Sequence, residues 1–500
     1  MKRRDFCQSI GVLGLAVSIP PVPAAAAPRT AGGASAQQAF ASSFEAVPEQ
    51  FGPTRLRFDR PLPEGLRGTL YRNGPAGMAH GTMRYRHWFD GDGMVHAWQL
   101  AGDSVVHRAR IVQTDRRRAE RAAGRLLWPG FGTDVADSRT VVNADTMNVA
   151  NISVLPVAEE LLALWEAGSS WALDPDTLET RERKVFSGDT DGLPFSAHPR
   201  IDTNGTIWNF GYLSGSGQLL LYELDRRGRL RRAAAIEAPQ AEMVHDFVIT
   251  ERHLGFVLMP LAYDRQAAPG TAFMNRLHWR DQAPVIVLLI DKQRWQISHR
   301  FEVPAFFAFH FGNAHADGET VRISVARAPA FAPLMTAIGQ ATRGEPVTIP
   351  NREALSELVL DLRSGSASLQ ALPVLGAEFP CIDPRQAGRR NRHTYMLGNT
   401  EQQARQMFGF NSVMHFDHER GHLARFDYGA HTLAEEHLFV AAPGGREGEG
   451  WLLGTAFDWR AHRTRLSVFD ASHLADGPVA TAELPYGLPL GLHGRWRAAS

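Results

Sequence analysis

The chain contains little of several residue types that define common protein classes. Its 500 residues include two cysteines, Cys7 and Cys381, which are too few for a disulfide framework or a Cys-x-x-Cys metal clip. Lysine occurs only as Lys2, Lys184 and Lys292, so arginine carries most of the positive charge. The 53 basic and 53 acidic side chains cancel. Because no net field attracts nucleic acid or acidic lipid, we expect no nucleic-acid partner.

Long hydrophobic runs and several catalytic motifs are also missing. No stretch after the N-terminal region reaches the roughly 18 uncharged apolar residues that a membrane-spanning helix needs. The sequence has no G-x-S-x-G elbow, no Walker loop and no G-x-G-x-x-G after a predicted strand. These absences argue against serine hydrolases, P-loop nucleotide hydrolases and dinucleotide-binding enzymes.

The first 40 residues are predicted to be an export signal and a leader. Arg3 and Arg4 precede an apolar run at 10–19 and the small residues at 24–27. Residues 1–26 therefore resemble a cleaved twin-arginine signal, which predicts an exported, periplasmic protein; a disordered basic N-terminus is the alternative. Residues 27–40 are predicted to be a flexible leader. This leaves residues 41–500 as a single domain.

The body of the chain alternates short apolar segments with turn residues. Strand-like runs at 206–212 and 218–224 flank a Ser-Gly-Ser-Gly turn, and similar units occur at 171–185, 358–369 and 451–471. The 46 glycines and 30 prolines suit a turn-rich fold. Strands without βαβ alternation predict an all-β domain, either a β-propeller or a large barrel.

Four of the 20 histidines lie in apolar or Gly/Pro-framed segments: His198, His245, His310 and His493. Their wide separations place them on different strands, as a site on the axis of a propeller requires. A single histidine in such a segment is more often an ordinary core or turn residue. Spacing alone therefore leaves both interpretations open.

Two other motifs resemble metal sites only superficially. HERGH (418–422) satisfies the H-E-x-x-H pattern of zinc peptidases, but its flanks alternate as strands and Gly421 would interrupt the helix. A hairpin turn is predicted instead. HWFDGDGMVHAW (87–98) carries two aspartates and two glycines, yet its spacing differs from an EF-hand loop. A tight turn is predicted there too.

Nine segments resemble, in order, the motifs of the carotenoid cleavage oxygenases. They are YRNGP (71–75), HWFDGDGMVHA (87–97), ALWEAG (163–168), FSAHPRID (195–202), MVHDF (243–247), FHFGNA (309–314), EFPCID (378–383), EEHLFV (435–440) and GLHGRW (491–496). The resemblance covers residues 44–497. It implies a seven-bladed β-propeller with a helical and loop cap over an iron-bearing top face.

The resemblance also implies one Fe(II) ion per chain, with O2 as co-substrate. The implied ligands are His198, His245, His310 and His493. The family orients its ligands with three glutamates, and the matching residues are Glu166, Glu378 and Glu436. Neutral imidazoles suit iron and leave coordination positions open.

The implied reaction is oxidative cleavage of a carbon–carbon double bond of a carotenoid or apocarotenoid, giving carbonyl products. Stilbenoid cleavage on the same site is the alternative. Stilbene-cleaving members hold the phenol with a tyrosine and a lysine, but Ile111 stands at the expected tyrosine position and no lysine lies between Lys2 and Lys184. A non-catalytic propeller that binds apolar ligands and an isomerase with the same fold are further alternatives.

An apolar substrate implies apolar surfaces. Phe306, Phe307 and Phe309, together with Ile111, are predicted to line a substrate tunnel, with a core strand as the alternative for the phenylalanines. A second set has helical spacing and predicts a peripheral membrane contact, with burial in the cap as the alternative: Phe331, Leu334, Met335 and Ile338. No obligate protein partner is implied.

Overall fold

The computed structural model describes residues 36, 38–45, 47–348, 352–406 and 408–499. The predicted export signal, residues 1–26, lies outside these residues and stays a prediction. The predicted leader, 27–40, overlaps helix α1 (Ala39–Ser42), in which Ala39 and Phe40 are buried. Phe40 packs against Trp88, so the folded domain begins before residue 41.

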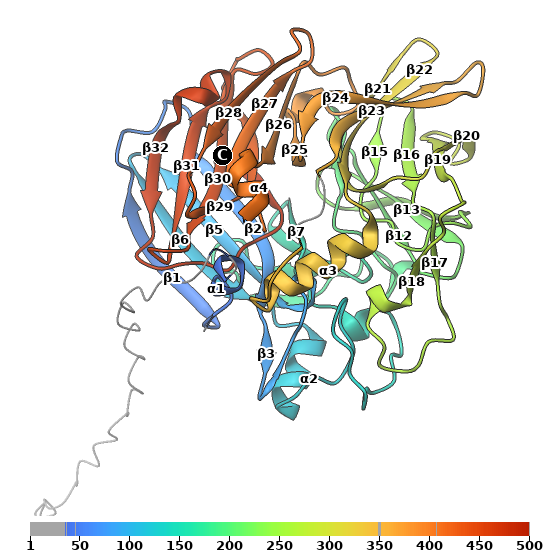
Figure 1. Ribbon diagram of the computed structural model, residues 1–500, viewed down its shortest axis with the longest axis horizontal. Coiled ribbons are helices and arrows are strands. Elements are labelled where there is room, and N and C mark those ends of the chain that lie inside the picture. Colours follow the sequence, from blue (N-terminus) through green and yellow to red (C-terminus); the bar gives the residue numbers. More distant parts are fainter. Residues whose placement is uncertain (1–35, 37, 46, 349–351, 407, 500) are drawn as a thin grey trace, which may run out of the picture. The chain divides into compact units, whose positions relative to one another are not determined.

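Seven antiparallel sheets follow one another along the described chain and form the blades of a β-propeller, which confirms the expected fold (Figure 1). The first blade contains β1 (Gln50–Arg57), β6 (Ser104–Ile111), β5 (Asp92–Ala101), β2 (Gly68–Gly77) and β33 (Gly494–Ala498). The second contains β7 (Ser153–Val157), β8 (Glu160–Leu164), β9 (Trp171–Leu173) and β10 (Thr180–Arg183). The third contains β11 (Arg200–Ile201), β12 (Ile207–Tyr212), β13 (Gln218–Leu224) and β14 (Leu230–Glu237).

The remaining four blades follow the same order. The fourth contains β15 (Val248–Ile249), β16 (His253–Leu258), β19 (Val285–Asp291) and β20 (Ile297–Val303). The fifth contains β21 (Phe307–Asp317), β22 (Thr320–Ala328), β23 (Ala354–Asp361) and β24 (Ala367–Leu375). The sixth contains β25 (Glu378–Cys381), β26 (His393–Gly398), β27 (Ser412–Asp417) and β28 (His422–Asp427), and the seventh contains β29 (Thr432–Ala441), β30 (Gly450–Asp458), β31 (Arg463–Asp470) and β32 (Pro478–Glu483).

The last strand closes the ring. β33 pairs with β2 in antiparallel register from Gly68↔Ala498 to Arg72↔Gly494, so the C-terminal end of the chain completes the blade that its N-terminal part begins. Closure of this kind leaves only short, protected edges between blades. Because His493 directly precedes β33, the same pairing fixes the position of that histidine.

Burial along the strands explains the blade architecture. β12 is buried over its whole length, whereas β14, the fourth strand of the same blade, exposes most of its residues.

The predicted hairpin at 206–224 is confirmed by the antiparallel pairing of β12 with β13. The HERGH segment connects β27 to β28 as a tight turn, which confirms that it does not form a peptidase helix.

Helices and loops cover one end of the blades. Helices α1, α2 (Asp115–Ala123) and α3 (Phe331–Thr342) and strand β3 lie together below the sheets in the view of Figure 1. Shorter elements complete the connections: α4 (Glu401–Gln406), η1 (Trp88–Asp90), η2 (Ala144–Met147), η3 (Gly188–Thr190), η4 (Phe273–Arg276), η5 (Pro384–Gln386), η6 (Ala471–Asp476) and the ribbons β3 (Ala79–His80) with β4 (Met83–Arg84) and β17 (Leu261–Tyr263) with β18 (Leu277–Trp279).

Helix α3 corrects the predicted membrane patch. Phe331, Met335 and Ile338 are at most 4% exposed and pack into the core, and Leu334 is half-buried. The apolar face of α3 therefore covers the propeller, which is the burial in the cap that the alternative predicted. Among the described residues, no helix has the length and apolar content needed to cross a membrane.

Candidate metal centre

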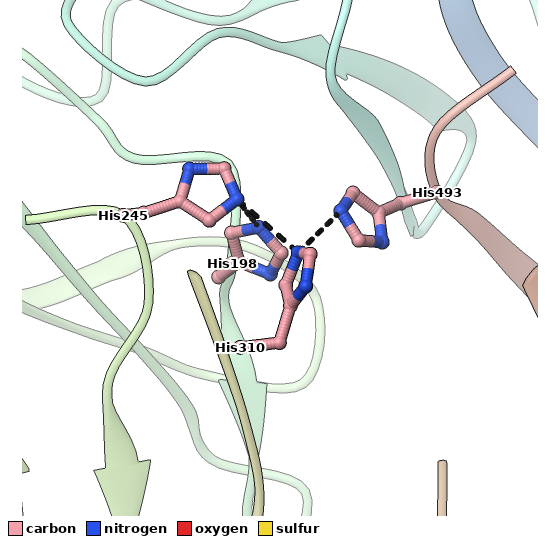
Figure 2. Close-up of side chains that lie close together, drawn as sticks. All are labelled: His198, His245, His310 and His493. Atoms are coloured by element: carbon pink, nitrogen blue, oxygen red, sulfur yellow. Dashed lines mark hydrogen bonds between the residues drawn. The ribbon is translucent and has the colours of Figure 1, made fainter. Parts of the chain in front are cut away.

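The four predicted histidines converge at the centre of the propeller (Figure 2). His198, His245 and His493 lie within three residues of the start of β11, β15 and β33, and His310 lies in β21. The Nε2 atom of His245 is 3.0 Å from that of His198 and 3.3 Å from that of His310, and His310 Nε2 is 3.1 Å from His493 Nε2. All four candidate ligand atoms lie within 4.8 Å of one another.

The three predicted glutamates accept hydrogen bonds from the opposite side of three of these rings. Nδ1 of His245 is 2.5 Å from Glu166, Nδ1 of His310 is 2.5 Å from Glu378, and Nδ1 of His493 is 2.9 Å from Glu436. A carboxylate that accepts the Nδ1–H fixes the tautomer in which Nε2 carries a lone pair. Three such lone pairs then point at one small space, where a cation removes their mutual repulsion. The arrangement therefore fits a metal ion.

The site uses every blade of the ring. Glu166 follows β8, Glu378 begins β25 and Glu436 lies in β29, while the four histidines belong to the other four blades. Each of the seven residues is thus supplied by a different blade, in or within three residues of a strand. Only closure of the propeller brings the set together.

Backbone and side-chain donors hold the glutamates in turn. Glu166 accepts the hydroxyl hydrogen of Tyr212, Glu378 accepts the backbone N–H of Phe379 at 2.8 Å, and Glu436 accepts that of Gly494 at 2.7 Å. Burial opposes ionisation of Glu436, but His493 outweighs it and lowers the pKa of the carboxyl. Burial and Glu166 raise the pKa of Tyr212 well above its usual range, so its hydroxyl stays a donor.

Burial holds two of the four imidazoles neutral, as metal ligands must be. Burial, reinforced by the neighbouring histidines, lowers the pKa of His198 well below its usual range. Burial lowers the pKa of His493 to about 4, against the attraction of Glu436. For His310, Glu378 outweighs the effect of burial and raises the pKa.

Carboxylates outnumber guanidinium groups around the cluster. The three glutamates and Asp246, which is 1% exposed, lie beside the histidines. Arg200 pairs with Asp246, and Arg495 donates to the Pro199 carbonyl at 2.5 Å. This excess of acidic groups favours a cation at the cluster.

An apolar cavity opens on the cap side of the histidines. Its volume is about 370 Å³, within the range of small-molecule pockets. His245, His310 and His493 border it, and its wall is rich in aromatic side chains, including Trp88, Phe89, Phe131, Phe273, Phe309 and Phe379. Tyr263 also lies on this wall. Exposed Val141 and Leu213 border the cavity as well.

A second cavity of about 820 Å³ also adjoins the cluster and is lined by more polar surface than the first. His198, His310 and His493 border it together with apolar residues and with charged and amide side chains, including Arg200, Asp246, Asn313 and Arg495. The histidine cluster therefore lies between two cavities that differ in polarity.

The predicted tunnel residues are only partly placed on the apolar cavity. Phe309 borders it, with its ring 5.3 Å from that of His245. Phe306 and Phe307 do not; Phe307 packs against Phe331 of α3, at 5.3 Å between ring centres. Ile111 ends β6 and packs beside Ala76, Met94 and Ala109, away from the cavity. These three side chains are used in core packing, which for the phenylalanines is the alternative that the sequence left open.

Several residues of the site were not predicted. Arg200 and Asp246 lie two residues after His198 and one after His245, so the ligand motifs contained them without indicating a role. Asp90 and Asp92 of the segment 87–98 bind no common centre: Asp90 accepts the hydroxyl of Thr133, and Asp92 pairs with Arg117. Only the first part of that segment is the predicted turn, since η1 (Trp88–Asp90) leads directly into β5 from Asp92; the turn supplies Trp88 and Phe89 to the cavity.

A seven-bladed propeller with four convergent histidines, three of them held by glutamates, defines a class of β-propeller protein with an axial metal site. The family model described as retinal pigment epithelial membrane protein matches residues 44–498. The chain belongs to this family, that of the carotenoid cleavage oxygenases.

Several relatives extend over nearly the whole chain. The chain is 30% identical to apocarotenoid-15,15'-oxygenase of Synechocystis sp., covering 87% of this chain and 91% of the relative. It is 30% identical to lignostilbene-alpha,beta-dioxygenase isozyme III of Sphingomonas paucimobilis (89% and 94%) and 29% identical to isoeugenol monooxygenase of Pseudomonas nitroreducens (88% and 94%). The solved structure of cobalt-substituted Synechocystis apocarotenoid oxygenase superposes with a TM-score of 0.81 at 26% identity, covering 93% of this chain and 99% of that one.

Proposed function

We propose that the protein is a non-haem iron(II) oxygenase that cleaves a carbon–carbon double bond of a carotenoid or apocarotenoid. The observation that carries the proposal is the histidine cluster, because it faces an aromatic cavity in a chain 30% identical to an apocarotenoid oxygenase. His198, His245, His310 and His493 would hold the metal. When bound, iron(II) would supply the electron-transfer chemistry that lets O2 react with an alkene.

The protein's own residues would bind, orient and isolate the substrate. The aromatic wall offers dispersion contacts to a conjugated chain along its length, and Phe309, beside His245, lies where the reacting double bond would pass. Cap residues such as Leu334 and Ile338 add apolar surface to the cavity wall. The cleavage balances without a further reductant, because one O2 supplies one oxygen atom to each of two carbonyl products.

Cleavage of a stilbenoid or a phenylpropene is the second candidate. Tyr263 on the cavity wall offers a hydroxyl that can bind a substrate phenol, and two relatives are named for lignostilbene and isoeugenol. Neither Lys184 nor Lys292 borders the cavity, since each pairs with an acid elsewhere. A phenolate would therefore find no lysine there. The apocarotenoid proposal stays first for that reason.

Reconstitution tests both candidates. Apoprotein loaded anaerobically with Fe(II) is exposed to ¹⁸O2 with an apocarotenal, resveratrol or isoeugenol, and the products are read by mass spectrometry. We expect ¹⁸O-labelled aldehyde from the apocarotenal. Aldehyde from only the phenolic alkenes favours the second candidate. Binding of iron without cleavage of any alkene contradicts the proposed reaction.

A further inference from the structure

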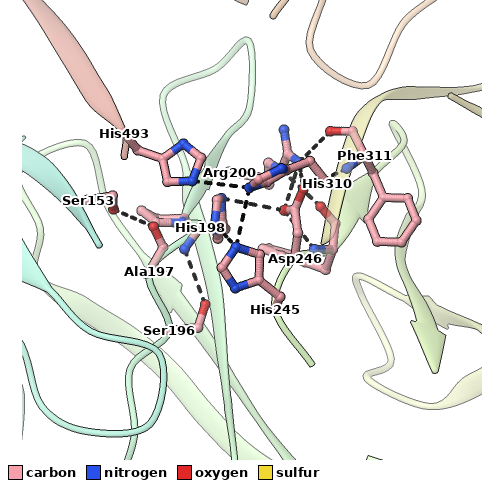
Figure 3. Close-up of polar contacts among 12 residues, drawn as sticks. Ser153, Ser196, Ala197, His198, Arg200, His245, Asp246, His310, Phe311 and His493 are labelled. Atoms are coloured by element: carbon pink, nitrogen blue, oxygen red, sulfur yellow. Dashed lines mark hydrogen bonds and ion pairs between the residues drawn. The ribbon is translucent and has the colours of Figure 1, made fainter. Parts of the chain in front are cut away.

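An arginine–aspartate pair lies directly beside the histidine cluster (Figure 3). The terminal nitrogen Nη2 of Arg200 lies 2.8 and 2.6 Å from the two carboxylate oxygens of Asp246. Asp246 also accepts the backbone N–H of Phe247 at 2.8 Å and that of Phe311 at 2.9 Å. This buried carboxylate is thus saturated by donors from three separate segments of the chain.

Arg200 donates hydrogen bonds to the carbonyl groups of the same two residues whose N–H groups donate to Asp246. Its guanidinium donates to the carbonyl oxygens of Phe247 at 2.9 Å and Phe311 at 3.0 Å, with a longer contact to Gly312 at 3.5 Å. The segments joined in this way carry His198, His245 and His310. The pair therefore ties the backbones beside three of the four candidate ligands.

His198 differs from the other three candidate ligands in the partner of its Nδ1 atom. The other three histidines each donate Nδ1–H to a glutamate, but Nδ1 of His198 lies 3.9 Å from Asp246, too far for a hydrogen bond. No carboxylate of the described residues accepts a hydrogen bond from this ring. Its position depends on the backbone of residues 198–200, which Arg200 anchors.

We propose that Arg200 and Asp246 are positioning residues that set the spacing of three ligand histidines, and so the affinity and geometry of metal binding. The inference rests on the metal-binding part of the proposed function. The planar guanidinium of Arg200 has several N–H donors in fixed directions, so it can donate hydrogen bonds to a carboxylate and two carbonyl oxygens at once. The single ammonium group of a lysine cannot do this.

The chain contains a matched control. The guanidinium of Arg392 binds the carboxylate of Asp417 in a similar way, with Nε at 3.0 and 3.1 Å and Nη2 at 2.7 Å from the carboxylate oxygens. Asp417 likewise accepts two backbone N–H groups, from Glu419 and Arg420. This pair lies in the sixth blade and borders neither cavity.

The test compares Asp246→Asn, Arg200→Met and Arg200→Lys with Asp417→Asn and Arg392→Met. Affinity for Co²⁺ is measured by chelator competition, ligand geometry by the visible absorption of bound Co²⁺, and folding by the Tm of the metal-free protein. We expect the Arg200 and Asp246 variants to lose roughly 10- to 100-fold in affinity and to shift the cobalt bands. The Arg392 and Asp417 variants should lower Tm only.

The outcomes separate this inference from the proposed function. If wild-type protein binds no Co²⁺, both fail. If wild type binds and the Arg200 and Asp246 variants lower Tm without changing affinity or spectrum, the pair is structural and this inference alone is overturned. Arg200→Lys keeps the charge, so it decides the matter if the more drastic variants do not fold: unchanged affinity and spectrum for this variant overturn the inference.

Discussion

The two sides of the histidine cluster are built differently. The cap side is aromatic and is formed by segments between strands, such as η1 with Trp88 and Phe89, and by helix α3. The other side is more polar and is formed by residues in or beside inner strands, with Arg200, Asp246 and Asn313. His310 and His493 border both spaces. The difference teaches that the aromatic side chains of the cap can be changed without altering a candidate ligand, and the Arg200–Asp246 pair without altering the aromatic wall.

The largest expected effect comes from removing a residue that borders both sides. His310→Ala deletes one of four candidate ligands, so metal affinity should fall by more than the roughly 100-fold that loss of an outer partner costs. Product formation should fall with it. Bound iron is measured by elemental analysis and product by mass spectrometry.

His315, five residues further along β21, is the control for this change. Its ring lies outside the cluster, and His315→Ala should retain both metal and activity. Full metal content in His310→Ala would contradict the four-histidine site.

A smaller effect is expected from a residue that acts through a ligand. Glu378→Gln keeps the shape of the side chain but removes the charge that orients His310. We expect a loss of roughly 10- to 100-fold in metal affinity, read by chelator competition. An unchanged affinity would show that the carboxylate is not needed to orient the ring.

Two phenylalanines of one segment, Phe306 and Phe309, test whether the apolar cavity binds the substrate. Phe309→Ala opens the cavity wall and should raise KM about tenfold, since a loss of about 1.4 kcal/mol in binding is a factor of ten, while metal content stays that of wild type. Phe306→Ala removes a core side chain outside the cavity, so it should cost about 3–5 kcal/mol of unfolding free energy and leave KM unchanged. Urea unfolding measures the stability of both variants, and steady-state kinetics distinguish them. Equal KM values for the two variants would mean that Phe309 does not contact substrate.

The smallest effect concerns the pH dependence of stability on the cap side. Burial lowers the pKa of His87 from 6.5 to about 3. Between these values the unfolded chain binds a proton that the folded protein does not, so the free energy of unfolding falls as the pH falls from 6.5 towards 3.

His87→Asn keeps an acceptor for the N–H of Phe89 at the start of η1 but removes this titration. The variant should therefore lose less stability than wild type between pH 7 and pH 5, as measured by urea unfolding. Identical losses would show that His87 does not contribute. Other buried histidines, such as His96, keep part of the dependence in both proteins.

Much of the site was predictable because its chemistry lies in short motifs. The four histidines and three glutamates were identified through the resemblance of their segments to the family's motifs, and the structure brings all seven together. Tyr212 was not identified, because β12 is simply a buried apolar strand in sequence and its contact with Glu166 spans two blades. Arg200 and Asp246 lay within the motifs, but their partners lie more than 40 residues away along the chain.

The substrate side was less predictable, and the reason is geometric. Phe306, Phe307 and Phe309 belong to one apolar segment, yet only Phe309 reaches the cavity, since Phe307 is taken up by packing on α3 and the pairing of β21 shifts between Ala308 and Phe311. Likewise, the amphipathic pattern of α3 is the same whether its apolar face covers a core or meets a membrane.

The sequence by itself therefore determined the all-β class and the set of candidate ligands. Period-two patterning, turn residues and the histidine and glutamate motifs are local properties that remain visible in any conformation of the chain. Only the tertiary structure decided which aromatic side chains face the cavity, how α3 is buried and how Arg200 joins three ligand segments. Those outcomes depend on contacts between segments distant in sequence, which exist only once the seven blades close into a ring.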